Sequence, residues 1–137
     1  MRSSFWKKFI WFFLLLIVFS KTTFAEEIWT EIETNNFHIV GNTNLTDLSK
    51  VAGKLEKFHD FFQQNFLKTR IQTPFHTNII VFKDDLSLNP FRLNQKFSNQ
   101  YFLSANDANY GLISLQNDES FEQIIVGYTK FLLENNF

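Results

Sequence analysis

The sequence predicts an α+β domain with one mixed or antiparallel sheet of about five short strands and two main helices, in the order β-β-α-β-β-β-α. Three observations predict this class. Short apolar or alternating segments end at turn residues, a stretch of about 20 residues carries apolar side chains at spacings of three and four, and a second such stretch lies near the C-terminus. The sequence contains no repeat, low-complexity tract or linker, so residues 26–137 are expected to form one domain.

Residues 1–25 have the composition of a signal peptide. Met1–Lys8 is basic, and Phe9–Phe19 is an unbroken run of eleven apolar residues. Thr23 and Ala25 are small residues at the positions that a signal peptidase reads. Eleven helical residues span only about 16 Å, roughly half of a hydrocarbon core about 30 Å thick. Cleavage near Ala25 is therefore favoured over an uncleaved membrane anchor. Whether or not it is cleaved, the leader is expected to export the chain to a periplasmic or extracellular location.

Two predicted strands follow the leader. Ile28–Glu33 alternates apolar or small residues with two glutamates, so one face of this strand is expected to be buried. Asn35-Asn36 marks a turn, and Phe37–Val40, closed by Gly41, is the second strand.

Two long helices are predicted from the helical period. The apolar stripe of the first, about 20 residues long, consists of Leu48, Val51, Ala52, Leu55, Phe58, Phe62 and Phe66. Asn44 or Thr46 can cap this helix, and Asp47 suits the positive end of its dipole. The second helix runs from Glu119, and its apolar residues are Phe121, Ile124, Ile125, Tyr128, Phe131 and Leu132.

Three more strands are predicted between the helices. Asn78–Phe82 is a nearly continuous apolar run, which is typical of a central strand buried on both faces. Asp84–Gln95 is expected to be irregular. Tyr101–Leu103 and Tyr110–Leu115 are predicted to form a hairpin around a turn at Asn106–Asn109.

Composition excludes several classes of function. The 137 residues include 13 Lys and Arg against 14 Asp and Glu. Without the four basic residues of the leader, nine basic residues remain and the net charge is −5, which would repel a nucleic acid. The absence of cysteine excludes a disulfide scaffold, a zinc ribbon and a thiol nucleophile. The sequence also lacks a glycine-rich phosphate loop.

The histidines are the first candidates for chemistry. His38 points away from the face that Phe37 and Ile39 share, so it is expected to be exposed or hydrogen-bonded. His76 lies just after Pro74 in a predicted loop, where solvent is expected to surround it.

Two pairs of residues could bind a metal or transfer protons. Glu56 and His59 have the E-x-x-H spacing of carboxylate-bridged metal sites, but the second pair that such sites need is missing, and neither metal nor cofactor is expected. Asp84-Asp85 could serve acid–base chemistry, but adjacent residues seldom face the same point, and a solvated loop is expected. Asn44-Leu45-Thr46 matches a glycosylation acceptor, although helix capping explains it better.

The predicted elements also carry a series of short motifs. In chain order they are Ile28-Trp29-Thr30-Glu31, Asn36–Val40, a long helix, Asn78–Phe82, Tyr101-Phe102-Leu103 and Asn106–Tyr110. This series, which covers essentially all of residues 28–137, resembles the N-terminal half of secreted bacterial zinc metallopeptidase-like domains of the gluzincin, or peptidase-MA-like, group.

The resemblance implies that the last helix should carry H-E-Y-x-H-L-L, in which two histidines hold zinc and the glutamate activates water. The motif falls on Val126-Gly127-Tyr128-Thr129-Lys130, followed by Phe131-Leu132-Leu133. Val126 and Lys130 stand at the ligand positions and Gly127 at the position of the general base, and none of them has the required lone pair or carboxylate at neutral pH. The chain stops at Phe137, before the segment of the family that carries the third ligand.

Three functions are compatible with these observations. The first and favoured one is an exported, non-catalytic domain, a truncated pseudoenzyme without zinc or another cofactor. The second is a periplasmic binding or assembly module that docks an envelope protein on the Val126/Lys130 side of the last helix. The third is a hydrolase with a site that has not been recognised. Membrane contact is expected only through an uncleaved leader.

In the resembled family the last helix lies between two subdomains, so its Val126/Lys130 side is expected to face solvent or a partner here. Gly127 in mid-helix also costs about 1 kcal/mol relative to alanine. Marginal stability and an exposed apolar patch near the C-terminus are therefore expected.

Overall fold

The computed structural model describes residues 26–67, 70–71, 73–92 and 100–137, so the predicted leader and its cleavage site lie outside the described residues. The elements in chain order are β1 (Thr30–Glu33), β2 (Phe37–Gly41), α2 (Leu45–Phe66), β3 (Thr77–Phe82), α3 (Asp85–Leu88), the 3₁₀ helix η1 (Asn89–Phe91), β4 (Phe102–Ser104), β5 (Asn109–Ser114) and α4 (Asp118–Asn136). The predicted α+β class and the order of the main elements are confirmed.

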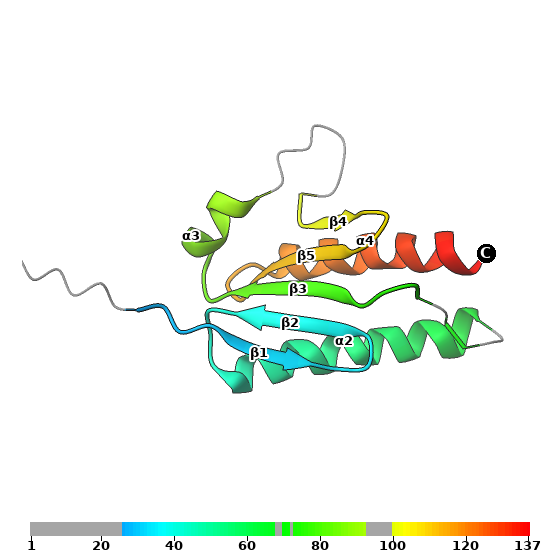
Figure 1. Ribbon diagram of the computed structural model, residues 1–137, viewed down its shortest axis with the longest axis horizontal. Coiled ribbons are helices and arrows are strands. Elements are labelled where there is room, and N and C mark those ends of the chain that lie inside the picture. Colours follow the sequence, from blue (N-terminus) through cyan, green and yellow to red (C-terminus); the bar gives the residue numbers. More distant parts are fainter. Residues whose placement is uncertain (1–25, 68–69, 72, 93–99) are drawn as a thin grey trace, which may run out of the picture.

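The five strands form one mixed sheet in the order β1-β2-β3-β5-β4 (Figure 1). The three inner strands β2, β3 and β5 run parallel, whereas β1 and β4 pair antiparallel at the two edges. Helix α2 provides the crossover that two parallel neighbours such as β2 and β3 require. None of the helices in the described residues is long and apolar enough to cross a membrane.

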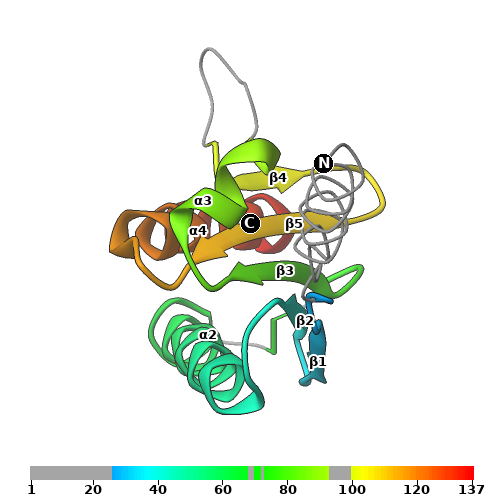
Figure 2. The same cartoon turned by 90° about the vertical axis from the view of Figure 1, so that its left-hand side faces the viewer.

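Both long helices pack on the same face of the sheet (Figure 2). The core lies between this face and the helices because apolar side chains alternate along the strands and recur at helical spacing in α2 and α4. Its fully buried members include Phe37, Ile39, Leu48, Leu55, Ile79, Val81, Ile124, Tyr128 and Leu132.

The prediction that the central strand β3 is buried on both faces is wrong. Ile79 and Val81 are buried beneath the helices, but Asn78 and Ile80 on the opposite face are only half buried. Neither of the two long helices in the described residues covers this face, because α2 and α4 lie on the same side of the sheet. The apolar character of Ile80 is instead explained by its position in register with Val40 and Leu112 on the neighbouring strands.

Helix α2 begins at the residue after its cap. The side chain of Asn44 accepts a hydrogen bond from the backbone N–H of Asp47 at 2.9 Å, and Asp47 places a carboxylate in the first turn. The capping interpretation of Asn44 is confirmed. The alternative cap, Thr46, is wrong, because Thr46 already lies inside the helix.

The segment after β3 is more regular than predicted. Its described part forms α3 and η1, and residues 93–95 lie outside the described residues. The expectation that Asp84-Asp85 lies in a solvated loop is wrong, because Asp84 Oδ1 caps α3 by accepting the Ser87 N–H at 2.8 Å. This hydrogen bond lowers the pKa of Asp84.

Candidate functional site

The first candidate site is the face of α4 at which the resemblance would place two zinc ligands. Val126 has 62% of its surface exposed, and Lys130 is also exposed, with its Nζ 3.8 Å from Glu134 Oε1 one turn later. These two positions face solvent, as predicted. A hydrophobic side chain and an ammonium group on this face offer no lone pair to a metal ion at neutral pH.

Gly127, at the position of the general base, has a packing role of its own. A Cβ atom at this position would lie 2.4 Å from Cδ1 of Phe102 and 2.7 Å from its Cβ. Real Cβ atoms essentially never approach other atoms this closely, so even an alanine would force Phe102, β4 or α4 to shift. Glycine here allows the edge strand β4 to lie directly against α4. A glutamate could not be accommodated without a shift of β4 or α4.

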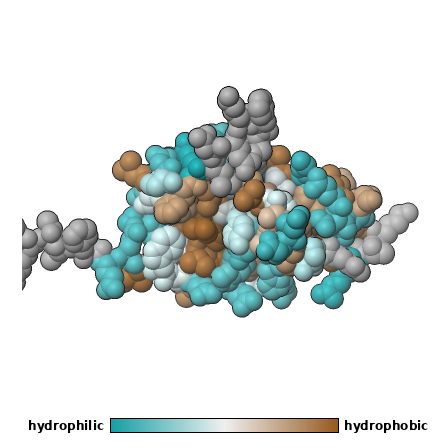
Figure 3. All heavy atoms as spheres, turned by 45° about the horizontal axis from the view of Figure 1, so that its top comes forward, coloured by the Kyte–Doolittle hydropathy of each residue, from teal (hydrophilic) through white to brown (hydrophobic). Residues whose placement is uncertain are grey.

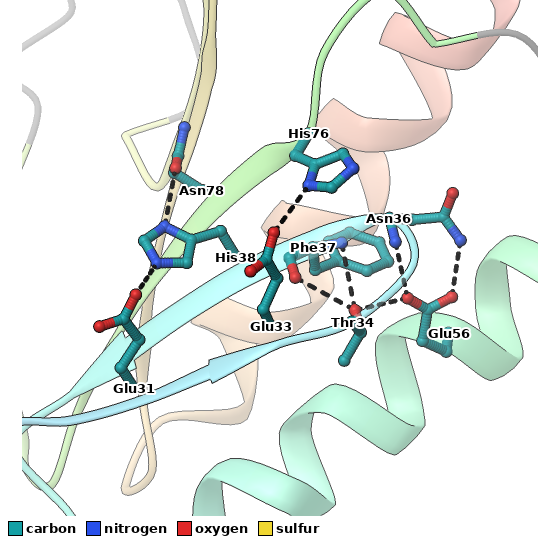
Figure 4. Close-up of polar contacts among 9 residues, drawn as sticks. All are labelled: Glu31, Glu33, Thr34, Asn36, Phe37, His38, Glu56, His76 and Asn78. Atoms are coloured by element: carbon teal, nitrogen blue, oxygen red, sulfur yellow. Dashed lines mark hydrogen bonds and ion pairs between the residues drawn. The ribbon is translucent and has the colours of Figure 1, made fainter.

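The E-x-x-H pair on α2 does not converge on one point. The Glu56 carboxylate accepts hydrogen bonds from Thr34 Oγ1 at 2.6 Å and from the backbone and side-chain nitrogens of Asn36 at 3.0 and 2.7 Å. Glu56 thereby ties the turn between β1 and β2 to the helix (Figure 4). His59 makes its contact elsewhere, and the described residues contain no group of three His, Cys, Asp or Glu side chains that could hold a metal ion.

His59 instead joins the two long helices inside the core. Its Nδ1 lies 2.8 Å from the hydroxyl oxygen of Tyr128, and both side chains are buried. Burial lowers the pKa of His59 and raises the pKa of Tyr128, because removal from water disfavours the charged form of each group. The pair is therefore a neutral hydrogen bond between α2 and α4. Sequence analysis identified both residues but not their contact.

A second cluster lies on the face of the sheet opposite the long helices (Figure 4). His38 Nε2 lies 2.5 Å from Glu31 Oε1, and His38 Nδ1 lies 3.2 Å from Asn78 Oδ1. The Asn78 amide is oriented by its NH₂ group, which donates to the backbone carbonyl of Asn109 at 3.2 Å. Both ring nitrogens of His38 therefore face acceptors, which requires a proton on each.

The surroundings of His38 consequently favour the imidazolium form. The hydrogen bond to Glu31 and then that to Asn78 raise the pKa of His38. The expectation that His38 is hydrogen-bonded is confirmed. His76 is half exposed, and its Nδ1 lies 3.7 Å from Glu33 Oε1 of strand β1, an ion-pair partner that the sequence around Pro74 does not reveal.

The His38 cluster makes the stability of the fold depend on pH. A raised pKa means that the stabilisation by His38 is complete below its unfolded pKa of about 6.5 and is lost as the pH rises through the folded pKa. We expect urea unfolding to show this loss for the natural chain and not for His38→Gln. Glu31→Gln is the control, since it removes the first cause of the shift and should reduce the same loss. An identical pH dependence in all three proteins would contradict the assignment.

A hollow lies where the parallel strands β2 and β3 end. It has a volume of about 640 Å³ and is lined by Glu26, Glu27, Ile28, Thr30, Asn42, Thr43, Asn44 and Lys83. The carboxyl ends of parallel strands are frequent ligand sites. Here, however, the polar groups bind one another: Glu27 Oε1 accepts from the amide of Asn42 at 2.9 Å and lies 3.4 Å from Lys83 Nζ. The backbone N–H of Lys83 donates to Asn42 Oδ1 at 2.8 Å.

This network fixes the start of the domain to the end of the sheet. Asn42 is buried and links Glu27 to the residue that follows β3. Sequence analysis missed it, because its three members are far apart in the chain and belong to no motif. A smaller hollow of about 280 Å³ lies between the first halves of α2 and α4, where the Lys54 ammonium sits 5.5 Å from the centre of the Phe121 ring.

Comparisons with protein-family models, with curated proteins and with solved structures gave no match to this chain. Its function is therefore argued from its own residues.

Proposed function

We propose that this chain is an exported domain, related to the N-terminal half of gluzincin-type metallopeptidase domains, that has no catalytic activity. The single observation that carries this proposal is the packing of Gly127 against Phe102. The position at which a general base would be needed is occupied by the contact between α4 and β4. The proposal thus rests on the role of Gly127, which stands at the position of the general base and allows α4 to pack against Phe102.

Two further features support the proposal. The relationship rests on the motif series along residues 28–137, which includes Tyr101-Phe102 at the edge strand and Tyr128 in α4. Export rests on the basic and apolar composition of residues 1–25. The exposed positions Val126 and Lys130 then form a solvent-facing surface in place of a metal site.

A metal-binding measurement tests this function directly. We expect the purified chain to bind no stoichiometric zinc in calorimetry and to cleave no peptide in a manner sensitive to a chelator. The matched control is the double variant Val126→His/Lys130→His, which places two imidazoles one helical turn apart on an exposed face and should bind Zn²⁺ measurably. One zinc per natural chain, or cleavage that a chelator abolishes, would refute the proposal.

A second candidate function is docking of an envelope protein on α4. The observation in its favour is that Val126 and Leu133 are exposed on this helix and Phe137 directly after its end. A purified stoichiometric complex that is lost in a Val126→Glu/Leu133→Glu variant, with the fold intact by circular dichroism, would favour this function over an inert domain.

A further inference from the structure

The edge strand β1 is tied to the rest of the sheet by two contacts between a glutamate and a histidine. Glu31 Oε1 lies 2.5 Å from His38 Nε2 on β2, and Glu33 Oε1 lies 3.7 Å from His76 Nδ1 just before β3 (Figure 4). The two glutamates are two residues apart and therefore share one face of β1. The strand lies at the lower front of the sheet in Figure 1, and the lower rim of the molecule in Figure 3 is mostly hydrophilic. We call these two contacts the β1 ion pairs.

Both ends of β1 are held by contacts that involve no histidine. Before the strand, Glu27 Oε1 accepts a hydrogen bond from the Asn42 amide and lies 3.4 Å from Lys83 Nζ. After it, Thr34 Oγ1 donates to the Glu56 carboxylate at 2.6 Å. Histidine is the one side chain whose charge ordinarily changes between pH 5 and 8. In this range of pH, the contacts in the middle of the strand therefore change while those at its ends persist.

The charged groups that face the imidazole of His38 come from β1. Among the described residues, the charges that act on it are those of Glu31 and Glu33. Strand β3 contributes the uncharged amide of Asn78, and Tyr110 of β5 is in register with Asn78, one strand further away. The hydrogen bond to Glu31, followed by that to Asn78, raises the pKa of His38. This ion pair is therefore complete below about pH 6.5 and is lost as the pH rises through the folded pKa.

The register of the strands shows which backbone amides depend on β1. The N–H of Thr34 donates to the carbonyl of Phe37 at 2.9 Å, so the alternation of the antiparallel ladder directs the N–H groups of Ile39 and Gly41 towards β1. We call these two groups the β1-facing amides. The N–H of Val40, between them, points towards β3 instead. Separation of β1 from β2 would therefore expose the β1-facing amides and leave Val40 paired.

We propose that the β1 ion pairs form a pH-sensitive device that controls how often the edge strand β1 opens. At pH 5.5, where histidine side chains ordinarily carry a proton, Glu31 and Glu33 hold the strand against the sheet. As the pH rises towards 8, both ion pairs are lost, and the middle of β1 separates from β2 more often. The open state leaves an unpaired edge on β2, to which a further strand can add. The inference goes beyond the proposed function, since it depends on the contacts of β1 and not on the lack of catalysis.

Amide hydrogen exchange of the full chain, followed by NMR between pH 5.5 and pH 8, tests this device. Each measured rate is divided by the intrinsic rate of an unstructured peptide at the same pH, which removes the direct effect of hydroxide. We expect the protection of Ile39 and Gly41 to fall roughly three- to tenfold from pH 5.5 to pH 8. Val40 on the same strand and Val81 in the central strand exchange without the opening of β1, so their protection should fall less.

Two double variants separate charge from packing. His38→Gln/His76→Gln keeps hydrogen-bonding groups that cannot take up a proton, so the β1-facing amides should exchange at pH 5.5 with the low protection of the natural chain at pH 8. His38→Lys/His76→Lys keeps two positive charges at pH 8 and should preserve the higher protection. Glu134→Gln is the matched control, because it removes an exposed carboxylate that pairs with Lys130 on α4 and should leave the exchange of β2 unchanged.

Three results would overturn the proposal. An equal loss of protection at Val40 and at the β1-facing amides would assign the pH dependence to unfolding of the whole domain. A pH dependence that persists in His38→Gln/His76→Gln, or that is absent from the natural chain, would remove the histidines from the device. Equal exchange of the lysine and glutamine variants at pH 8 would show that charge does not hold β1. None of these results bears on the zinc measurement that tests the proposed function.

Discussion

Replacing Gly127 with leucine is expected to lower the free energy of unfolding by about 2–3 kcal/mol. The new Cβ would lie 2.4 Å from the Phe102 ring, so either β4 or α4 must shift. The gain in helix propensity, about 1 kcal/mol over glycine, offsets only part of this cost. Urea unfolding followed by circular dichroism measures the difference.

Gly53 is the matched control for this substitution. It lies in the middle of α2, and a Cβ there would meet nothing within 4 Å. Gly53→Leu should therefore raise the free energy of unfolding by roughly 0.5–1 kcal/mol through helix propensity alone. Equal effects of leucine at the two positions would contradict the packing role of Gly127. Phe102→Ala should recover part of the stability of Gly127→Leu, because it removes the ring that the leucine meets.

The helices and the faces of the strands could be predicted because burial follows periodicity. Most of the apolar residues at helical spacing, among them Leu48, Leu55 and Ile124, are buried in the core, whereas Phe66 at the end of α2 is 58% exposed. The alternation in Phe37–Val40 correctly placed His38 on the opposite face from the core. These local patterns were sufficient to say which side of α2, α4 and β2 is covered, whereas the continuous apolar run of β3 wrongly predicted burial on both faces.

The pairings inside the site could not be predicted, because they depend on topology. Glu56 contacts Thr34 across 22 residues, and His59 contacts Tyr128 across 69. His38 meets Asn78 because β2 and β3 are parallel neighbours in register, which the pattern of a single strand does not specify. Sequence analysis named Glu56, His59 and His38 as candidates, but it did not identify the residues that they contact.

The short helix α3 and the packing role of Gly127 were missed for different reasons. α3 has four residues, which is too short for an apolar period, and its only sequence signal was the capping spacing from Asp84 to Ser87. Gly127 was interpreted only as a cost to the helix. The cost in helix propensity is offset by the close packing of α4 against Phe102 in β4. No property of the helix sequence indicates that Gly127 and Phe102 approach so closely.

The second large effect is expected for the buried pair His59 and Tyr128. Tyr128→Phe removes the hydroxyl and leaves Nδ1 of a buried imidazole without its partner, which should lower the free energy of unfolding by about 2 kcal/mol. Replacing both residues, with His59→Leu added, should cost less than the sum of the two single changes, because no polar atom is then left unsatisfied. Strictly additive losses would contradict a direct hydrogen bond.

The same pair gives the fold a sensitivity to acid that is opposite in sign to that of His38. Burial lowers the pKa of His59, so the folded state resists a proton that the unfolded state takes up below about pH 6.5. Stability should therefore fall as the pH drops from 6.5 through the folded pKa of His59, and His59→Leu should remove this fall. Comparing the free energy of unfolding at pH 7 and at pH 5 separates the contributions of the two histidines to stability. The stabilisation by His38 is already complete at pH 5, so a fall in stability at that pH reports on His59. An unchanged acid response in His59→Leu would mean that His59 is protonated in the folded core, a state that its burial against Tyr128 opposes.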